Sequence, residues 1–194
     1  MDKKSIFLCT LIIFVTVLVI AGILYNNQSA SAQPGIAGTA QTDESTAPGD
    51  TQADDSSEAP NFYFTDYEGN RVMLASFEGK PLILNFWASW CGPCKSEMPD
   101  LEEAYKTYGD QIHFIMLNLT DGSRETVEKA KAYMESQDYT FPVYFDTQQY
   151  GAYFFSVNAI PVTYFIDAQG NVAGMYAGSM DANILQQGID LLLP

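Results

Sequence analysis

The sequence has few of the residues that bind metals or form structural disulfides. Its 194 residues include three cysteines and one histidine. Cys9 lies in an apolar run, so Cys91 and Cys94 are the only cysteines in the rest of the chain. A zinc site needs four protein ligands, or three and a water. His113 is the only histidine and lies in the middle of an expected strand, where a packed or surface histidine is the more common role, and no second Cys or His pair exists. Neither a metal nor another cofactor is therefore expected.

Basic residues are also scarce, with 9 Lys and Arg against 24 Asp and Glu and a formal net charge of −15. Without Asp2, Lys3 and Lys4, 23 acidic and 7 basic residues remain. A surface of this charge repels phosphate backbones, so nucleic acid is excluded as a partner.

Charged residues are absent from Ser5 to Leu24, a run of 20 mostly apolar residues preceded by Lys3 and Lys4. Such a run is long enough to cross a bilayer, and the lysines would keep the N-terminus in the cytoplasm. Residues 1–25 are therefore expected to be a single-pass anchor in a bacterial cell membrane, with the rest of the chain extracytoplasmic. Ala30-Ser31-Ala32 resembles a cleavage site, so a signal peptide is the alternative.

Residues 26–60 contain no lysine, arginine or aromatic residue. This segment cannot bury enough apolar surface to offset its ordering entropy, which predicts a disordered acidic tether. The globular domain is expected over 61–194, enough chain for an apolar core without disulfide staples.

The apolar pattern of this domain predicts an α/β fold, with a mixed central sheet and helices on both faces. The expected strands cover 61–65, 71–74, 82–87, 112–119, 143–145, 161–167 and 172–176. The expected helices cover 96–108, 124–136, 148–155 and 182–193. The cysteines follow the buried strand 82–87, at the carboxyl end where active groups of open α/β sheets lie.

The cysteine pair fits a reversible dithiol better than a permanent staple, because closing so short a loop constrains the unfolded chain little. A helix N-terminus stabilises a thiolate and lowers the pKa of the first cysteine. Cys91 is thus the expected nucleophile, and Cys94 would resolve the mixed disulfide. Gly92 would allow a substrate backbone close, Pro93 would fix the first helical turn, and Trp90 would form an apolar wall.

The stretch "FWASWCGPCKSEMP" resembles the active-site segment of thioredoxin-like proteins. The tether and the order of elements resemble the membrane-anchored TlpA/ResA group of extracytoplasmic thiol–disulfide oxidoreductases. The resemblance implies a thioredoxin fold with an N-terminal strand extension. It also implies a disulfide reductase for exported proteins, of which apocytochrome c is one known substrate class in the group.

Three further site residues are expected with the help of this resemblance. In "NAIPVTYFID", Pro161 occupies the place of a cis-proline that faces the cysteines, and the backbone of Ile160 would pair with an extended substrate. Thioredoxin has a buried Asp six residues before its first cysteine, where this chain has Asn85. Asp121 is the candidate proton-transfer group in its stead, with a pKa raised by burial. Because Asp-Gly is a common turn pair, Asp121 has a purely structural interpretation as well.

The favoured function is a monomeric, tethered reductase that acts on exported disulfide-containing proteins and is recharged by a membrane thiol electron donor. A disulfide-forming oxidant and a non-catalytic thioredoxin-like binding module are the alternatives. The Gly92-Pro93 dipeptide resembles that of reducing thioredoxins, which favours the reductase.

Overall fold

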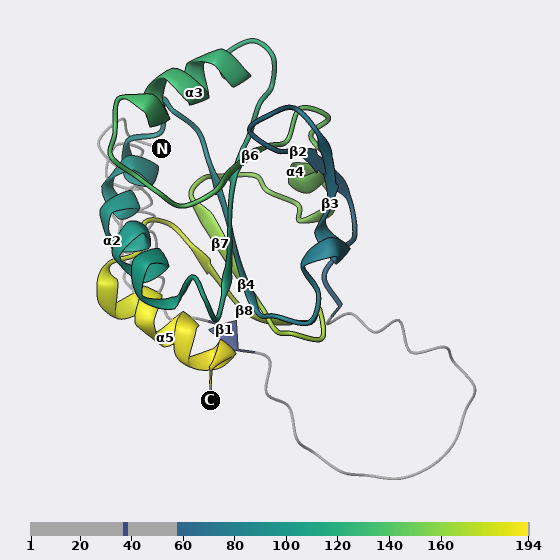
Figure 1. Ribbon diagram of the computed structural model, residues 1–194, viewed down its shortest axis with the longest axis vertical. Helices are drawn as coiled ribbons and strands as arrows, with labels where there is room; N and C mark the ends of the chain where they lie inside the picture. Colours follow the sequence, from purple (N-terminus) through teal and green to yellow (C-terminus); the bar gives the residue numbers. More distant parts are fainter. Residues whose placement is uncertain (1–36, 39–57, 194) are drawn as a thin grey trace, which may run out of the picture. The chain divides into compact units, whose positions relative to one another are not determined.

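The computed structural model describes residues 37–38 and 58–193 (Figure 1). The segment 5–24, expected to be an anchor, lies outside this part of the chain. Among the residues that are described, no helix has the length and apolar character needed to cross a membrane.

An eight-stranded mixed sheet forms the centre of the domain, in the order β1-β8-β7-β4-β5-β6-β2-β3. Its strands are β1 (Ala37–Gly38), β2 (Tyr63–Thr65), β3 (Arg71–Met73), β4 (Leu82–Trp87), β5 (His113–Asn118), β6 (Val143–Phe145), β7 (Val162–Ile166) and β8 (Val172–Ala177). The helices are η1 (Leu74–Phe77), α2 (Gly92–Tyr108), α3 (Val127–Glu135), α4 (Tyr150–Phe154) and α5 (Ala182–Leu192). The expected fold class is confirmed.

The central strand β4 is buried on both faces, as its near-continuous apolar run predicts. It pairs in parallel with β5 and antiparallel with β7. Side chains of a strand alternate between the two faces of the sheet. Ile83 and Trp87 belong to one core, and Leu84 and Phe86 belong to the other. Asn85 therefore lies on the same face as Ile83 and Trp87.

Helices pack on both faces of the sheet (Figure 1). The core that contains Trp87 includes side chains from α2, α3 and α5, namely Met98, Leu101, Ala130, Met134, Leu185 and Ile189. The opposite core is closed by the N-terminal β2–β3 hairpin, η1 and the end of α4, with Phe62, Phe64, Leu74 and Phe155.

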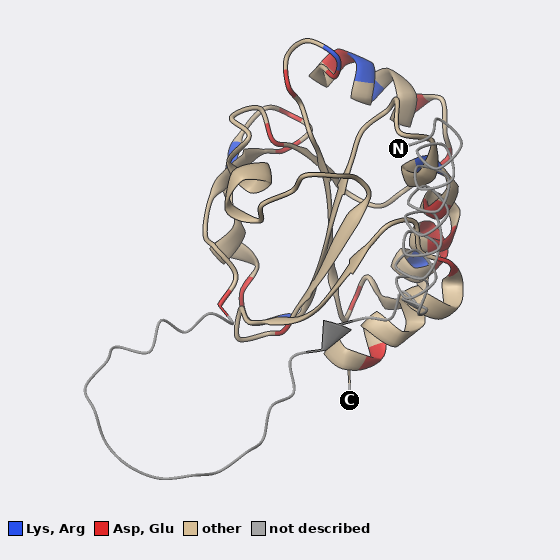
Figure 2. Cartoon of the chain, turned by 180° about the vertical axis from the view of Figure 1, so that it is seen from behind, with Lys and Arg blue, Asp and Glu red and all other residues tan. Residues whose placement is uncertain are grey.

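Acidic residues outnumber basic ones along the chain in Figure 2.

Part of the segment expected to be a disordered tether is ordered. Ala37 and Gly38 pair with β8. Glu58 forms a bridge with Asn171, and the backbone N–H of Ala59 donates to the Gly170 carbonyl at 2.8 Å. At these positions backbone pairing with a sheet edge or turn holds a segment that has few apolar side chains.

Two helices begin at positions that capping explains. Cys91 is the N-cap of α2, so this helix starts at Gly92, four residues before the expected 96. Thr126 caps α3 by accepting a hydrogen bond from the Lys129 backbone N–H. Helix α3 accordingly starts at Val127 instead of Arg124.

Candidate active site

Cys91 and Cys94 form a disulfide at the start of α2, with 5.3 Å between their Cα atoms. The backbone N–H of Cys94 donates to the Cys91 sulfur at 3.2 Å. Cys91 is 4% exposed, whereas Cys94 is fully buried. Cys91 is thus the less buried of the two residues, and it lies where unpaired helical N–H groups stabilise a thiolate.

The peptide bond between Ile160 and Pro161 is cis, as expected. It lies beside the disulfide, because the Cys91 sulfur is 3.8 Å from the Ile160 carbonyl oxygen. The Pro161 carbonyl accepts a hydrogen bond from the Gly178 backbone N–H at 2.9 Å. The start of β7 is therefore fixed beside the cysteines by the segment that follows β8.

An exposed surface surrounds the accessible sulfur. Gly92 and Pro93 are exposed in the first turn of α2. Trp90 is 41% exposed, and the Arg124 guanidinium lies 3.4 Å from the centre of its ring. A cation at this distance over an aromatic face is attracted to it and restricts the motion of the indole. Trp90 is thus an exposed ring, held by Arg124, in the residue that precedes Cys91.

The turn that precedes Cys91 is held by a buried carboxylate. Glu125 is 1% exposed and accepts three hydrogen bonds. They come from the Ser89 backbone N–H at 2.8 Å, the Ser89 hydroxyl at 2.7 Å and Asn118 Nδ2 at 2.7 Å. The loop after β5 is in this way fastened to the loop that carries Trp90 and Cys91.

The structure contradicts the expected burial of Asp121. Its side chain is exposed, and Oδ1 accepts hydrogen bonds from the backbone N–H groups of Ser123 at 2.7 Å and Glu125 at 2.9 Å. These hydrogen bonds, first that from Glu125, lower the pKa of Asp121 instead of raising it. A carboxylate whose pKa is lowered is a weaker base at neutral pH, so these contacts favour the structural role of Asp121 in the turn over proton transfer.

The buried acid next to the disulfide is Glu97, which is 1% exposed in α2. Oε1 accepts from Asn85 Nδ2 at 2.8 Å, and Oε2 accepts from the Met180 backbone N–H at 2.9 Å. Burial raises the pKa of Glu97 to about 7, against the opposing effect of the hydrogen bonds from Met180 and Asn85. Glu97 can therefore gain or lose a proton near neutral pH.

The family model that describes AhpC/TSA proteins matches residues 56–175, which include the disulfide, Glu97 and Pro161. This chain belongs to the AhpC/TSA family.

Two curated relatives cover most of this AhpC/TSA chain. The thiol-disulfide oxidoreductase ResA of one Bacillus cereus strain is 35% identical over 140 residues, which are 71% of this chain and 78% of ResA. The thioredoxin-like protein YneN of Bacillus subtilis (strain 168) is 32% identical over 134 residues, 69% of this chain and 78% of YneN.

A solved structure supports the same relationship. The thiol:disulfide interchange protein of Chlorobium tepidum TLS, a thioredoxin family protein, has a TM-score of 0.62 and 29% identity to this chain. The match covers 75% of this chain and all of that one.

Sequence reasoning missed the two buried acids on either side of the cysteine pair in this AhpC/TSA chain, Glu97 and Glu125. Glu97 had a signal, because it lies three residues after Cys94, one turn along the apolar face that continues to Met98 and Leu101. An acid on such a face is buried and has a perturbed pKa. Glu125 gave only a weak signal, since an acid just before a helix normally indicates a capping position.

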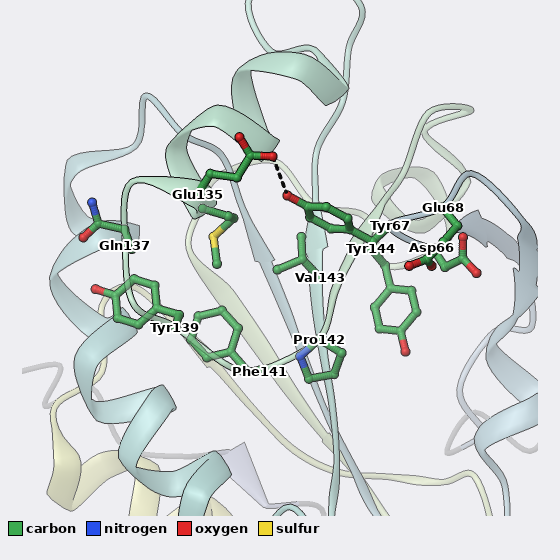
Figure 3. Close-up of a pocket in the computed structure, with 11 residues that line it drawn as sticks. Asp66, Tyr67, Glu68, Glu135, Gln137, Tyr139, Phe141, Pro142, Val143 and Tyr144 are labelled. Atoms are coloured by element: carbon green, nitrogen blue, oxygen red, sulfur yellow. Dashed lines mark hydrogen bonds between the residues drawn. The ribbon is translucent and has the colours of Figure 1, made fainter.

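A pocket of about 520 Å³ lies away from the disulfide, between the β2–β3 turn, the end of α3 and the start of β6 (Figure 3). Tyr67 spans it and donates its hydroxyl to Glu135 at 3.4 Å. None of the expected site residues lines this pocket.

In the part of the chain that is described, no group of three or more His, Cys, Asp or Glu is placed to hold a metal ion.

Proposed function

We propose that this protein reduces disulfides of exported proteins, with apocytochrome c as a candidate substrate. One observation carries the proposal: the more accessible sulfur, that of Cys91, lies at a helix N-terminus and 3.8 Å from the Ile160 carbonyl that precedes the cis-proline. The names of the relatives, among them thiol-disulfide oxidoreductase ResA, support the same chemistry.

The first step forms a mixed disulfide. In the reduced protein the Cys91 thiolate attacks one sulfur of the substrate disulfide, so that a new sulfur–sulfur bond forms and the substrate bond breaks. The other substrate sulfur leaves as a thiolate and takes a proton from solvent. The Cys94 N–H and the helix N-terminus stabilise the attacking thiolate.

The second step releases the substrate. The Cys94 thiol gives its proton to the Glu97 carboxylate and attacks the Cys91 sulfur. The disulfide between Cys91 and Cys94 forms, and the remaining substrate sulfur leaves as a thiolate. The substrate gains two electrons and the protein loses two, which leaves the oxidised state described above. Glu97 suits this role because its pKa, raised by burial to about 7, allows it to accept and release the proton.

The surface around Cys91 would bind the substrate. The Ile160 backbone carbonyl, 3.8 Å from the Cys91 sulfur, would pair with an extended peptide, and Pro161 would cover the cysteines on that side. Trp90, Gly92 and Pro93, which are exposed and flank Cys91 in the sequence, would form the other surface. A peptide bound between these two surfaces would present its disulfide to Cys91.

The cellular setting is part of the proposal. The apolar run of residues 5–24 would anchor the chain in a bacterial cell membrane as a single span, with the domain extracytoplasmic. A membrane thiol electron donor would then reduce the disulfide after each turnover, and the protein would act as a monomer. These assignments are supported by the sequence pattern and by similarity to ResA.

Trapping tests the function directly. A Cys94→Ser variant completes the first step and cannot release the substrate, so it should accumulate mixed disulfides with exported proteins through Cys91. A Cys91→Ser variant keeps the buried thiol of Cys94 and a similar fold, and should trap none. Equal trapping by both variants would contradict the assigned roles.

A further inference from the structure

We infer that Asn85 and Thr163 are positioning residues that aim the Glu97 carboxylate, an inference that rests on the proposed role of Glu97 in the second step. The two residues are register partners on the neighbouring strands β4 and β7. Both are fully buried. Asn85 Nδ2 donates to Glu97 Oε1 at 2.8 Å and to the Thr163 hydroxyl oxygen at 2.8 Å.

The orientation of the Asn85 amide follows from these two acceptors. The reverse orientation would place the amide oxygen against an oxygen of Glu97, where two acceptors would meet without a proton between them. In the observed orientation the Asn85 Oδ1 is buried and has no hydrogen-bond partner in the described part of the chain. A buried unpaired oxygen is costly, typically about 1–3 kcal/mol. The protein thus leaves one amide oxygen unpaired in order to direct both N–H groups of Asn85.

Glu97 depends on this arrangement because it has few other partners. Among the described residues its two hydrogen-bond donors are Asn85 Nδ2 and the Met180 backbone N–H. Met180 holds one carboxylate oxygen from the segment after β8, and Asn85 holds the other from β4. The carboxylate is therefore fixed between two elements, one turn of α2 away from Cys94.

Thr163 acts on Glu97 through Asn85. Its hydroxyl oxygen accepts the second N–H of the amide, which prevents the amide from rotating away from the carboxylate. Thr163 lies two residues after Pro161, in the strand that directly follows the cis-proline. The two hydrogen bonds thus connect Thr163 on β7 to Asn85 on β4, and Asn85 to Glu97 on α2.

The test compares four variants of the full-length oxidised protein by carbon-13 NMR titration of the Glu97 carboxyl. Asn85→Ala removes one of its two donors and should move the titration midpoint upward by about one pH unit, since a hydrogen bond to an ion is worth roughly 1.5–3 kcal/mol. Thr163→Val should move it in the same direction by a smaller amount. Thr163→Ser keeps the hydroxyl and should restore the wild-type midpoint. Thr65→Val, which removes a hydroxyl bonded to the Phe145 carbonyl near the other edge of the sheet, should leave it unchanged.

A second readout separates this inference from the proposed function. The reduced protein is mixed with an aromatic disulfide that releases a coloured thiolate in each of the two steps, and the pH profile of the second release is measured. The profile should move with the Glu97 midpoint in each variant. A midpoint that stays at the wild-type value in Asn85→Ala and in Thr163→Val would overturn the positioning role. A midpoint that moves while the profile stays in place would overturn the proton transfer through Glu97.

Discussion

The acidic residues on the two sides of the cysteine pair have pKa values shifted in opposite directions. On the α2 side, Glu97 is buried with two neutral donors, and its pKa rises to about 7. On the side of the loop after β5, Asp121 is exposed, and backbone donors lower its pKa. Glu125 in the same loop uses both oxygens to hold Ser89 and Asn118. Burial and the surrounding hydrogen-bond donors set the pKa of each carboxyl group, and they decide which acid can take part in proton transfer near neutral pH.

The first way to test this contrast is the pH dependence of stability. Glu97 has an ordinary pKa of 4.5 and a folded pKa of about 7, so the folded state binds more protons than the unfolded state between these values. The free energy of unfolding should consequently fall as pH rises through this window, by about 3 kcal/mol in total. Chemical denaturation at several pH values should show a flatter profile for Glu97→Gln. Identical profiles would mean that Glu97 titrates normally in the fold.

The next largest effect is expected on the release of the mixed disulfide. Glu97→Gln cannot accept the Cys94 proton and should slow the second step about 100-fold at pH 7. Asp121→Asn keeps the oxygen that accepts both backbone hydrogen bonds and should leave this rate unchanged. Stopped-flow measurement of the second thiolate release gives both rates. A slow Asp121→Asn variant beside a normal Glu97→Gln variant would reverse the assignment.

The structural role of Glu125 predicts a smaller effect, on stability. Glu125→Ala leaves the Ser89 N–H and Asn118 Nδ2 without their acceptor, and should cost about 2 kcal/mol. Glu125→Gln can retain all three hydrogen bonds if the Ser89 hydroxyl turns to accept from the new amide. Its free energy of unfolding should lie close to the wild-type value. Equal losses in the two variants would show that the charge, and not the hydrogen bonding, is what the loop requires.

The smallest effect concerns Asp121. Asp121→Ala removes the acceptor of the Ser123 and Glu125 backbone N–H groups at an exposed turn, and should lower the melting temperature by about 2 °C. The rate of the second step should stay unchanged. A thermal scan with a parallel kinetic measurement would check this, and a large kinetic loss would restore a catalytic role to Asp121.

Much of the fold follows from apolar patterns in the sequence. The strand 82–87 was predicted with its observed limits because a continuous apolar run flanked by Pro81 and Ser89 has few alternatives. The start of α2 was missed by four residues, because a cysteine that caps a helix through its sulfur does not match the usual capping residues. Pairing of residues 37–38 was missed since backbone hydrogen bonds to a sheet edge require no particular side chain.

The cysteine pair was predictable, because the chemistry of two cysteines depends on their spacing and on the residues next to them. The spacing of Cys91 and Cys94 before a helix predicts a reversible dithiol, whereas the cis bond before Pro161 was expected only from the resemblance to thioredoxin-like proteins. The choice between Asp121, Glu97 and Glu125 depended on which carboxyl groups are buried and which donors surround them. Those contacts join residues up to 83 positions apart, as in the hydrogen bond from Met180 to Glu97, and local pattern does not reveal them.

The reduction potential of the Cys91–Cys94 couple tests the central claim most directly. The full-length protein is equilibrated with glutathione buffers of known potential, and the fraction of disulfide is measured by thiol alkylation. A reductase should have a potential near that of thioredoxin, roughly −270 mV, so that its dithiol form can donate electrons. A value near that of DsbA, roughly −120 mV, would make the protein an oxidant and contradict the account.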